Sequence, residues 1–229
     1  MTLDTHPHPG NLPLSSMQRT LQPELLDSLA PDDPAAIHNR RDLRLTNQIM
    51  GNHRWLARRL PGLLRPGELA LELGAGTGEL GLRLARANVR VDGLDLWPRP
   101  EAWPAGRAWH RADLRLFSGY AGYAAVLGNL IFHQFSDDEL AVLGSVLRRH
   151  SRVIVACEPV RRRISQVLFR SLGPLFGANQ VSLHDAHVSI AAGFRGDELP
   201  RALGLSAAAW DWLCTTTALG AYRMVALRR

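Results

Sequence analysis

The feature that most constrains the fold is a glycine-rich stretch, LALELGAGTGELG, which runs from Leu69 to Gly81. An apolar run ends in glycines that alternate with small residues, and a helix-forming sequence follows. Glycines at such a turn allow a close approach of backbone to a ligand that a Cβ would prevent. The order predicts a strand, a tight turn and a helix, and open α/β sheets bind ligands at that point.

The rest of the chain alternates between strand and helix patterns, which indicates a mostly parallel α/β sheet. A hairpin is expected at the end of the chain, because two strand patterns flank a tight turn at Leu219-Gly220. The predicted strands cover residues 68–73, 89–94, 107–110, 124–128, 152–157, 209–217 and 221–227, and helices are predicted at 34–60, 77–87, 137–149 and 196–203, with a short one at 21–29 and a partly helical segment at 160–179.

Composition excludes several classes of protein. The chain is 46% hydrophobic and 21% charged, as in ordinary globular proteins, and carries a net charge of +6. All of its 27 basic residues are arginines in small scattered groups, which favours solvated surface over a nucleic-acid partner. The cysteines, Cys157 and Cys214, lack metal-ligand spacing, and no signal peptide is recognisable at the N-terminus. A cytoplasmic protein is therefore expected.

The glycine spacing and the charge of Glu72 limit the classes of ligand that the glycine turn can bind. Counted from Gly76, the glycines meet the dinucleotide pattern G-x-G-x-x-G at 76, 78 and 81, so spacing alone does not exclude a dinucleotide. A phosphate-binding loop of the Gly-Lys-Ser/Thr type is excluded, because the chain has no lysine. The carboxylate of Glu72 would repel a pyrophosphate but suits a nucleoside with a cationic tail.

Four segments resemble motifs of one family. The segment Glu72 to Gly78 resembles the E-x-G-x-G-x-G motif of class I S-adenosylmethionine-dependent methyltransferases. Gly93 to Leu96 resembles the end of that family's second strand, where an acid binds both ribose hydroxyls. Ala112 to Leu114 resembles the motif whose Asp accepts from the adenine amino group. Gly128 to His133 resembles the segment that faces the transferred methyl group.

The resemblance implies a Rossmann-like, doubly wound fold with S-adenosylmethionine as cofactor. It divides the chain into a flexible tail (1–20), an N-terminal helical extension (21–66) and a methyltransferase domain (67–229). In the extension, Arg40-Arg41 and the stretch from Asn47 to His53 are placed to reach the cofactor or the substrate. The cofactor-binding residues that the motifs imply are Glu72, Gly74, Ala75, Gly76, Gly78, Asp95, Leu96, Ala112, Asp113, Leu114 and Asn129.

Histidines are the candidates for catalysis, because a phenol or alcohol must lose its proton to become a nucleophile. We expect His133 to be a neutral base, with its pKa lowered by the dry surroundings of Phe132 and Phe135. If the acceptor is already ionised, His133 only orients its ring; it is alternatively a loop cap before the helix at 137. His184 and His187 are further substrate-site candidates. They lack a third metal ligand at a recognisable spacing, so no metal is expected.

An apolar segment follows the fifth strand, where members of the family often insert elements that cover the substrate. A lid insertion is expected at 160–183, with Phe169 and Phe176 against the substrate, although a core helix is an equal interpretation. The arginines Arg161 to Arg163 before it are compatible with weak contact to an anionic membrane surface.

The sequence as a whole predicts methyl transfer from S-adenosylmethionine to an oxygen or carbon of a hydrophobic phenolic or quinone-like small molecule. The stretch SIAAGFRGDEL, from Ser189 to Leu199, resembles methyltransferases of quinone and secondary metabolism. Two alternatives remain open: a non-catalytic nucleoside-binding protein on the same fold, and a nicotinamide-dependent enzyme. The acceptor and the oligomeric state are not predicted.

Overall fold

The computed structural model describes residues 17–30 and 32–229. Its centre is a seven-stranded sheet in the order β3-β2-β1-β4-β5-β7-β6. Only β7 runs opposite to the other six strands, so the predicted mostly parallel sheet with a C-terminal hairpin is confirmed. The strands are β1 (Ala70–Leu73), β2 (Val91–Asp95), β3 (Trp109–Arg111), β4 (Ala125–Asn129), β5 (Val153–Pro159), β6 (Trp210–Thr216) and β7 (Ala221–Arg228).

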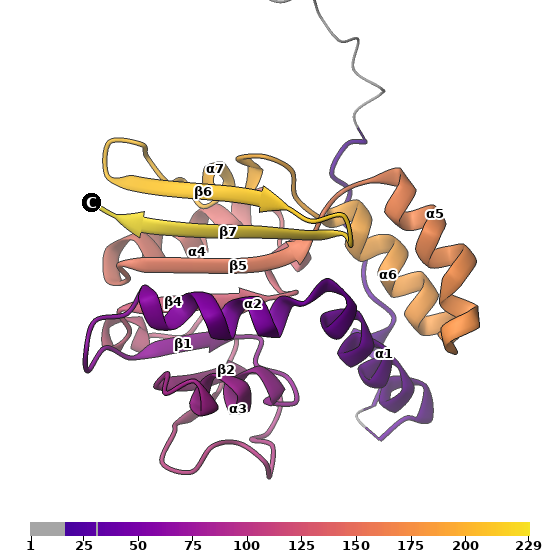
Figure 1. The fold of residues 1–229 in the computed structure, drawn as a ribbon, viewed down its shortest axis with the longest axis horizontal. Coiled ribbons are helices and arrows are strands. Elements are labelled where there is room, and N and C mark those ends of the chain that lie inside the picture. Colours follow the sequence, from indigo (N-terminus) through magenta and orange to yellow (C-terminus); the bar gives the residue numbers. More distant parts are fainter. Residues whose placement is uncertain (1–16, 31) are drawn as a thin grey trace, which may run out of the picture.

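Helices cover both faces of this sheet and the end at which its parallel strands finish (Figure 1). The faces carry α2 (Asn52–Arg59) with α3 (Glu79–Arg86), and α4 (Asp137–His150) with α7 (Glu198–Ala202). At the end lie α1 (Pro34–Met50), α5 (Arg163–Leu172) and α6 (Gln180–Ala192). Short 3₁₀ turns are η1 (Leu26–Ser28), η2 (Leu60–Gly62), η3 (Gly119–Gly122), η4 (Phe132–Gln134) and η5 (Gly173–Phe176). No helix in the described part of the chain is long and apolar enough to cross a membrane.

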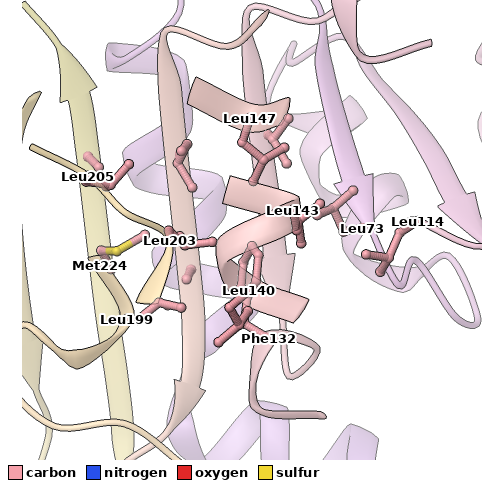
Figure 2. Close-up of a cluster of buried hydrophobic side chains, with 14 of the residues drawn as sticks. Leu73, Leu114, Phe132, Leu140, Leu143, Leu147, Leu199, Leu203, Leu205 and Met224 are labelled. Carbon is pink, nitrogen blue, oxygen red and sulfur yellow. The ribbon is translucent and has the colours of Figure 1, made fainter. Parts of the chain in front are cut away.

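The sheet divides the interior into two cores, and the inner strand β5 contributes to both. Its side chains alternate, so that Ile154 and Ala156 join one cluster while Val153 and Val155 join the other. In the first cluster, leucines of α4 and of the segment around α7 pack on the sheet (Figure 2). Because both faces of β5 are buried, its sequence is a continuous apolar run, as is usual for parallel strands between helices.

The helical extension differs from its prediction at Gly51. We expected one helix over 34–60, but α1 ends at Gly51, whose φ of 66° is left-handed, and α2 begins at the next residue. The predicted helix at 21–29 is only the turn η1. The helix α6 was not predicted, because its apolar residues lie on all sides and give no 3.6-residue period.

The predicted flexible tail lies mostly outside the described residues, which begin at Met17. The guanidinium of Arg19 donates to the carbonyl of Ala192 at 2.8 Å and to that of Phe135 at 2.7 Å. The amide of Thr20 donates to the carbonyl of Ala191 at 3.2 Å. Residues 17–20 are therefore bound to α6 and to the loop before α4.

The helix α4 approaches the backbone of Leu203 closely at Gly144, where an added Cβ would lie 2.7 Å from the Cα of Leu203. In a helix interior, alanine is more stabilising than glycine by about 1 kcal/mol. Inserting an extra methyl group into a packed core, however, costs about 1–3 kcal/mol. Because the Cβ would meet backbone rather than a movable side chain, we expect the upper part of that overpacking cost, so that Gly144→Ala lowers the free energy of unfolding by about 2 kcal/mol in urea titrations. Gly122→Ala is the control, because a Cβ there meets nothing within 4 Å. Equal stability of the two variants would contradict this account of the packing.

Candidate active site

The glycine-rich turn lies where β1 ends between β2 and β4, its two parallel neighbours. Gly74, Gly76 and Gly78 have φ values of 61°, 52° and 78°, which L side chains rarely adopt. At Gly74, an added Cβ would lie 2.8 Å from the Cδ1 of Ile131. The amides of Gly74 and Ala75 donate to the carbonyl of Leu94 at 2.9 and 3.3 Å. The turn is thus held against both neighbouring strands.

Glu72 lies on β1 below this turn and is almost fully buried, with 4% of its surface exposed. Its Oε2 atom has no hydrogen-bond partner among the residues that the structure describes. Burial, with a smaller contribution from Asp95, raises the pKa of Glu72 well above its usual value. A buried polar atom without a partner is costly, and such atoms mark positions that a ligand can complete.

Asp95 ends β2 and ties the glycine turn to the next loop. Its carboxylate accepts from the amide of Gly76 at 2.8 Å and from that of Trp97 at 2.9 Å. Burial raises the pKa of Asp95, although these backbone hydrogen bonds oppose the shift. Each carboxylate oxygen retains a lone pair for a further donor. The neighbouring Leu96 side chain is 64% exposed.

The predicted adenine motif follows β3 and lies beside the end of β2. The amide of Ala112 donates to the carbonyl of Asp95 at 3.0 Å, and Leu114 is buried. The Asp113 carboxylate is held by Arg115, whose guanidinium donates at 2.6 Å. This hydrogen bond lowers the pKa of Asp113. The structure therefore brings the motif to Asp95, with the Asp113 side chain turned to an arginine.

The helical extension contributes a polar cluster at the end of β4. Asn129 donates from Nδ2 to the Oδ1 of Asn47 at 3.0 Å, and Nδ2 of Asn52 donates to the same oxygen at 3.3 Å. The Oδ1 atoms of Asn129 and Asn52 are buried without partners among the described residues. Burial and the charge of Arg83 lower the pKa of His53, also in this cluster, to about 4. The predicted stretch 47–53 thus lies beside Asn129.

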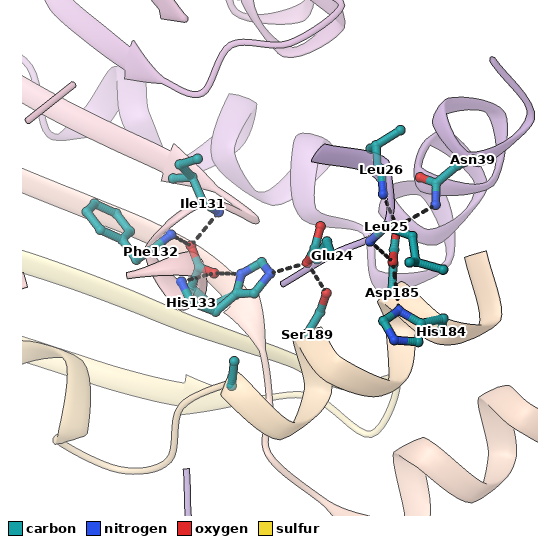
Figure 3. Close-up of polar contacts among 12 residues, drawn as sticks. Glu24, Leu25, Leu26, Asn39, Ile131, Phe132, His133, His184, Asp185 and Ser189 are labelled. Atoms are coloured by element: carbon teal, nitrogen blue, oxygen red, sulfur yellow. Dashed lines mark hydrogen bonds and ion pairs between the residues drawn. The ribbon is translucent and has the colours of Figure 1, made fainter. Parts of the chain in front are cut away.

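His133 lies between two carboxylates in the loop after β4. It is 3% exposed, and its Nδ1 is 2.6 Å from the Oε2 of Glu158 while its Nε2 is 3.2 Å from the Oε1 of Glu24. Figure 3 shows the imidazole facing Glu24, which in turn faces Ser189 on α6. Burial alone would lower the pKa of His133, but the two carboxylates outweigh it and raise the pKa to about 9.

The prediction of a lowered pKa for His133 is therefore wrong. It rested on the neighbouring phenylalanines and missed two carboxylates that lie 25 and 109 residues away in the chain. Both ring nitrogens donate when the imidazole is protonated, so the side chain has no free lone pair at neutral pH.

Glu158, at the end of β5, is a central residue that sequence reasoning did not select. Fully buried, it accepts from the amides of Ile131 at 3.1 Å, Phe132 at 2.9 Å and His133 at 3.3 Å. These bonds fix the loop after β4, in which Leu130 holds a left-handed φ of 59°. An acid that closes an apolar strand at the sheet's ligand-binding edge was the available signal.

A cavity of about 280 Å³ opens beside His133. The segment at 21–27, the loop after β4 and α6 enclose it, with Leu21, Glu24, Asp27, His133 and Ser189 among its walls. The other predicted substrate residues do not line it: His184 and His187 are exposed on α6, Phe176 is 60% exposed, and Phe169 lies half-buried on α5. In the described ranges 17–30 and 32–229, no three His, Cys, Asp or Glu residues group to hold a metal.

Comparison with known proteins identifies solved structures with a similar fold. No protein-family model and no curated protein match the chain. The plantazolicin methyltransferase BpumL, solved in complex with SAH, superposes with a TM-score of 0.64 at 11% identity, covering 86% of this chain and 91% of that one. Magnesium protoporphyrin IX methyltransferase (ChlM) from Synechocystis PCC 6803, with bound SAH, gives 0.50 at 17% identity over 89% and 91%.

A third structure, which concerns the conversion of a disulfide bond into a thioacetal group during echinomycin biosynthesis, gives a TM-score of 0.54 at 20% identity over 77% and 81%. The chain has the class I methyltransferase fold. The predicted Rossmann-like fold class is thereby confirmed. In this class I fold, Glu72, Asp95 and Asn129 come from β1, β2 and β4 and meet at one edge of the sheet.

The charge of His133 should link stability to pH. Its folded pKa of about 9 exceeds the ordinary value of 6.5, so its stabilising contribution is complete below pH 6.5 and is lost as the pH rises through about 9. We expect His133→Gln to lower the free energy of unfolding by about 3–5 kcal/mol at pH 6.5, and by less at pH 9.5. Urea unfolding at both pH values measures the difference, with the exposed His150→Gln as control. Between pH 6.5 and 9.5 the free energy of unfolding should fall more for the wild type than for His133→Gln. An equal fall in the two proteins would refute the raised pKa.

Proposed function

We propose that the chain is an enzyme that transfers a methyl group from S-adenosylmethionine to a hydrophobic small molecule. The observation that carries this proposal is the buried, unpartnered Oε2 of Glu72 beneath the glycine turn and beside Asp95. A cationic ligand would compensate this carboxyl group, and S-adenosylmethionine carries both an ammonium and a sulfonium charge. The fold of the chain, which it shares with methyltransferases solved with SAH, supports the same assignment.

The residues at this edge fit the parts of that cofactor. The carboxylate of Asp95 has lone pairs free for the two ribose hydroxyls. The unpartnered amide oxygens of Asn129 and Asn52 suit the amino-acid end, since they accept hydrogen bonds from an ammonium group. The segment from Ala112 to Leu114 lies beside Asp95, where the adenine would follow the ribose. When bound, the cofactor supplies an activated methyl group on sulfur.

A nicotinamide dinucleotide is the weaker alternative. The third glycine of the dinucleotide pattern, Gly81, packs against the ring of Trp103 in the loop after β2, so this close packing accounts for the glycine without a pyrophosphate. The phosphates of a dinucleotide offer no cation to the buried, unpartnered Oε2 of Glu72. A non-catalytic nucleoside-binding protein would share the cofactor site but form no S-adenosylhomocysteine.

The cofactor assignment predicts that S-adenosylmethionine and S-adenosylhomocysteine raise the melting temperature and that NADH does not. At a hundredfold excess of ligand over Kd, the free energy of unfolding should rise by about 2.7 kcal/mol. Asp95→Ala should weaken calorimetric binding of S-adenosylhomocysteine by about 2 kcal/mol, because the hydrogen bonds to ribose are lost. Glu101→Gln, on the exposed loop that follows β2, is the matched control and should bind as the wild type does. Binding of NADH without binding of S-adenosylhomocysteine would overturn the assignment.

We place the acceptor in the cavity beside His133. Its apolar walls include Pro23, Val188 and Ala192, while Glu24 and His133 form a polar edge. Such a cavity suits an aromatic ring with one polar substituent, as in a phenolic or quinone-like acceptor. Because His133 is protonated at neutral pH and both of its ring nitrogens are engaged by carboxylates, it does not remove the proton of the acceptor. The acceptor is therefore one that ionises by itself, such as an acidic phenol or hydroxyquinone, methylated on oxygen or on the adjacent carbon.

This role predicts the pH dependence of turnover. For two substituted phenols of different acidity, the rise of kcat/KM with pH should follow the pKa of each phenol, because the enzyme supplies no base. Initial rates of S-adenosylhomocysteine formation between pH 5 and 9 measure it. A rise at the same pH near 6.5 for both phenols would instead assign the proton transfer to a histidine.

A further inference from the structure

The helix α5 is the least buried α-helix of the described chain. None of its residues is buried, whereas every other α-helix, α1 to α4, α6 and α7, contains buried residues. In Figure 1 it lies outermost, against α6 and away from the sheet. Its contact with α6 includes a hydrogen bond at 2.9 Å from Nε2 of Gln166 to the carbonyl of His187. The opposite side of α5 faces solvent.

The two sides of α5 differ in kind. Toward α6 lie Gln166 and the half-buried Phe169, with Gly173 close to Leu183. The solvent side, which we call the α5 face, repeats apolar residues at helical spacing and continues into η5. Its members are Ile164, Val167, Leu168, Leu172, Leu175 and Phe176, which are 45–79% exposed. An apolar stripe of this kind is the face that an amphipathic helix normally buries.

Charge at the edge of the α5 face indicates what covers it. Arg163 and Arg170 are exposed and lie seven residues apart, so they share one side of the helix beside the apolar stripe. Neither forms an ion pair with a residue in the described ranges. The sequence from 159 to 184 contains four arginines and no Asp or Glu. A partner that accommodates both the apolar stripe and these arginines has an anionic surface layer with an apolar layer beneath it.

The predicted lid role does not account for this exposure. The cavity beside His133 is lined by α6 and by the segment 21–27, and no residue of α5 reaches it. The apolar surface continues beyond α5 instead. Leu219, 63% exposed, precedes Gly220, where a Cβ would lie 3.8 Å from the Oγ of Ser165. At the other end, Nε2 of His38 is 2.7 Å from the carbonyl of Gly177, which brings the exposed Ile37 near η5.

We propose that the α5 face docks on an anionic lipid bilayer, with its apolar side chains in the headgroup boundary and its arginines at the phosphates. Interfacial helices combine these two features, and arginine stems can extend along the apolar boundary to reach the phosphate layer. The contact would hold the end of the sheet that carries the cofactor and acceptor sites close to the membrane. The proposal concerns binding and does not depend on the reaction.

The test is flotation of the full chain with vesicles of phosphatidylcholine alone or mixed with phosphatidylglycerol. We expect binding to the mixed vesicles and little binding to the neutral ones. Ile164→Asp with Leu175→Asp should weaken binding at least about tenfold. Arg163→Gln with Arg170→Gln should weaken it by about fivefold per arginine, and only on anionic vesicles.

The matched control is Val142→Asp with Leu116→Asp, since these side chains are 64% and 82% exposed, close to the 60% and 79% of Ile164 and Leu175. The control should bind vesicles as the wild type does, and all variants should keep the melting temperature of the wild type. Absence of vesicle binding by the wild type, or equal binding by the α5 variants, overturns the proposal. A concentration-dependent dimer that the α5 variants abolish, without vesicle binding, would assign the face to a second copy of the chain.

Discussion

The arrangement of the site depends on one buried carboxylate, that of Glu158. It accepts hydrogen bonds from three backbone amides of the loop after β4 and from the ring of His133. These bonds set the path of the chain where the fourth strand ends. The same loop brings Ile131 against Gly74, where no side chain could be accommodated. Through His133 the charge also reaches Glu24, which attaches the N-terminal segment to the domain. Loss of either Glu158 or His133 would leave a buried charge unpaired. The end of β5, the loop after β4 with His133, and the N-terminal segment with Glu24 are therefore coupled.

The helical extension and the N-terminal segment complete a site that the sheet only begins. The strands provide Glu72, Asp95 and Asn129 at one edge. The extension adds Asn47 and Asn52 above Asn129, and the unpartnered amide oxygens among them indicate a ligand at this point. The segment around Glu24 closes the cavity beside His133, where we place the acceptor, on the other side of the loop. Cofactor and acceptor would thus meet across the loop from Asn129 to His133.

The parallel strands with their C-terminal hairpin, the glycine turn and the position of Asp95 at the end of β2 could be predicted from the sequence, because each depends on local pattern or on motif spacing. The environment of His133 could not, because its partners Glu24 and Glu158 join it only through the folded chain. Local apolar neighbours suggested a lowered pKa, while distant carboxylates decide the actual direction. The break at Gly51 escaped prediction because the apolar pattern continues across it, and α6 escaped because it lacks a polar side. The roles of the individual cofactor residues stay predictions.

The most direct measurement of the central claim is a crystal structure of the protein with S-adenosylhomocysteine. The account predicts the ribose hydroxyls within hydrogen-bond distance of Asp95, and the amino group of the ligand within reach of Glu72 or Asn129. The glycine turn should keep its left-handed backbone, since that conformation already leaves room for the nucleoside. A ligand bound away from this edge, with the Oε2 of Glu72 still buried and unpartnered, would contradict the account.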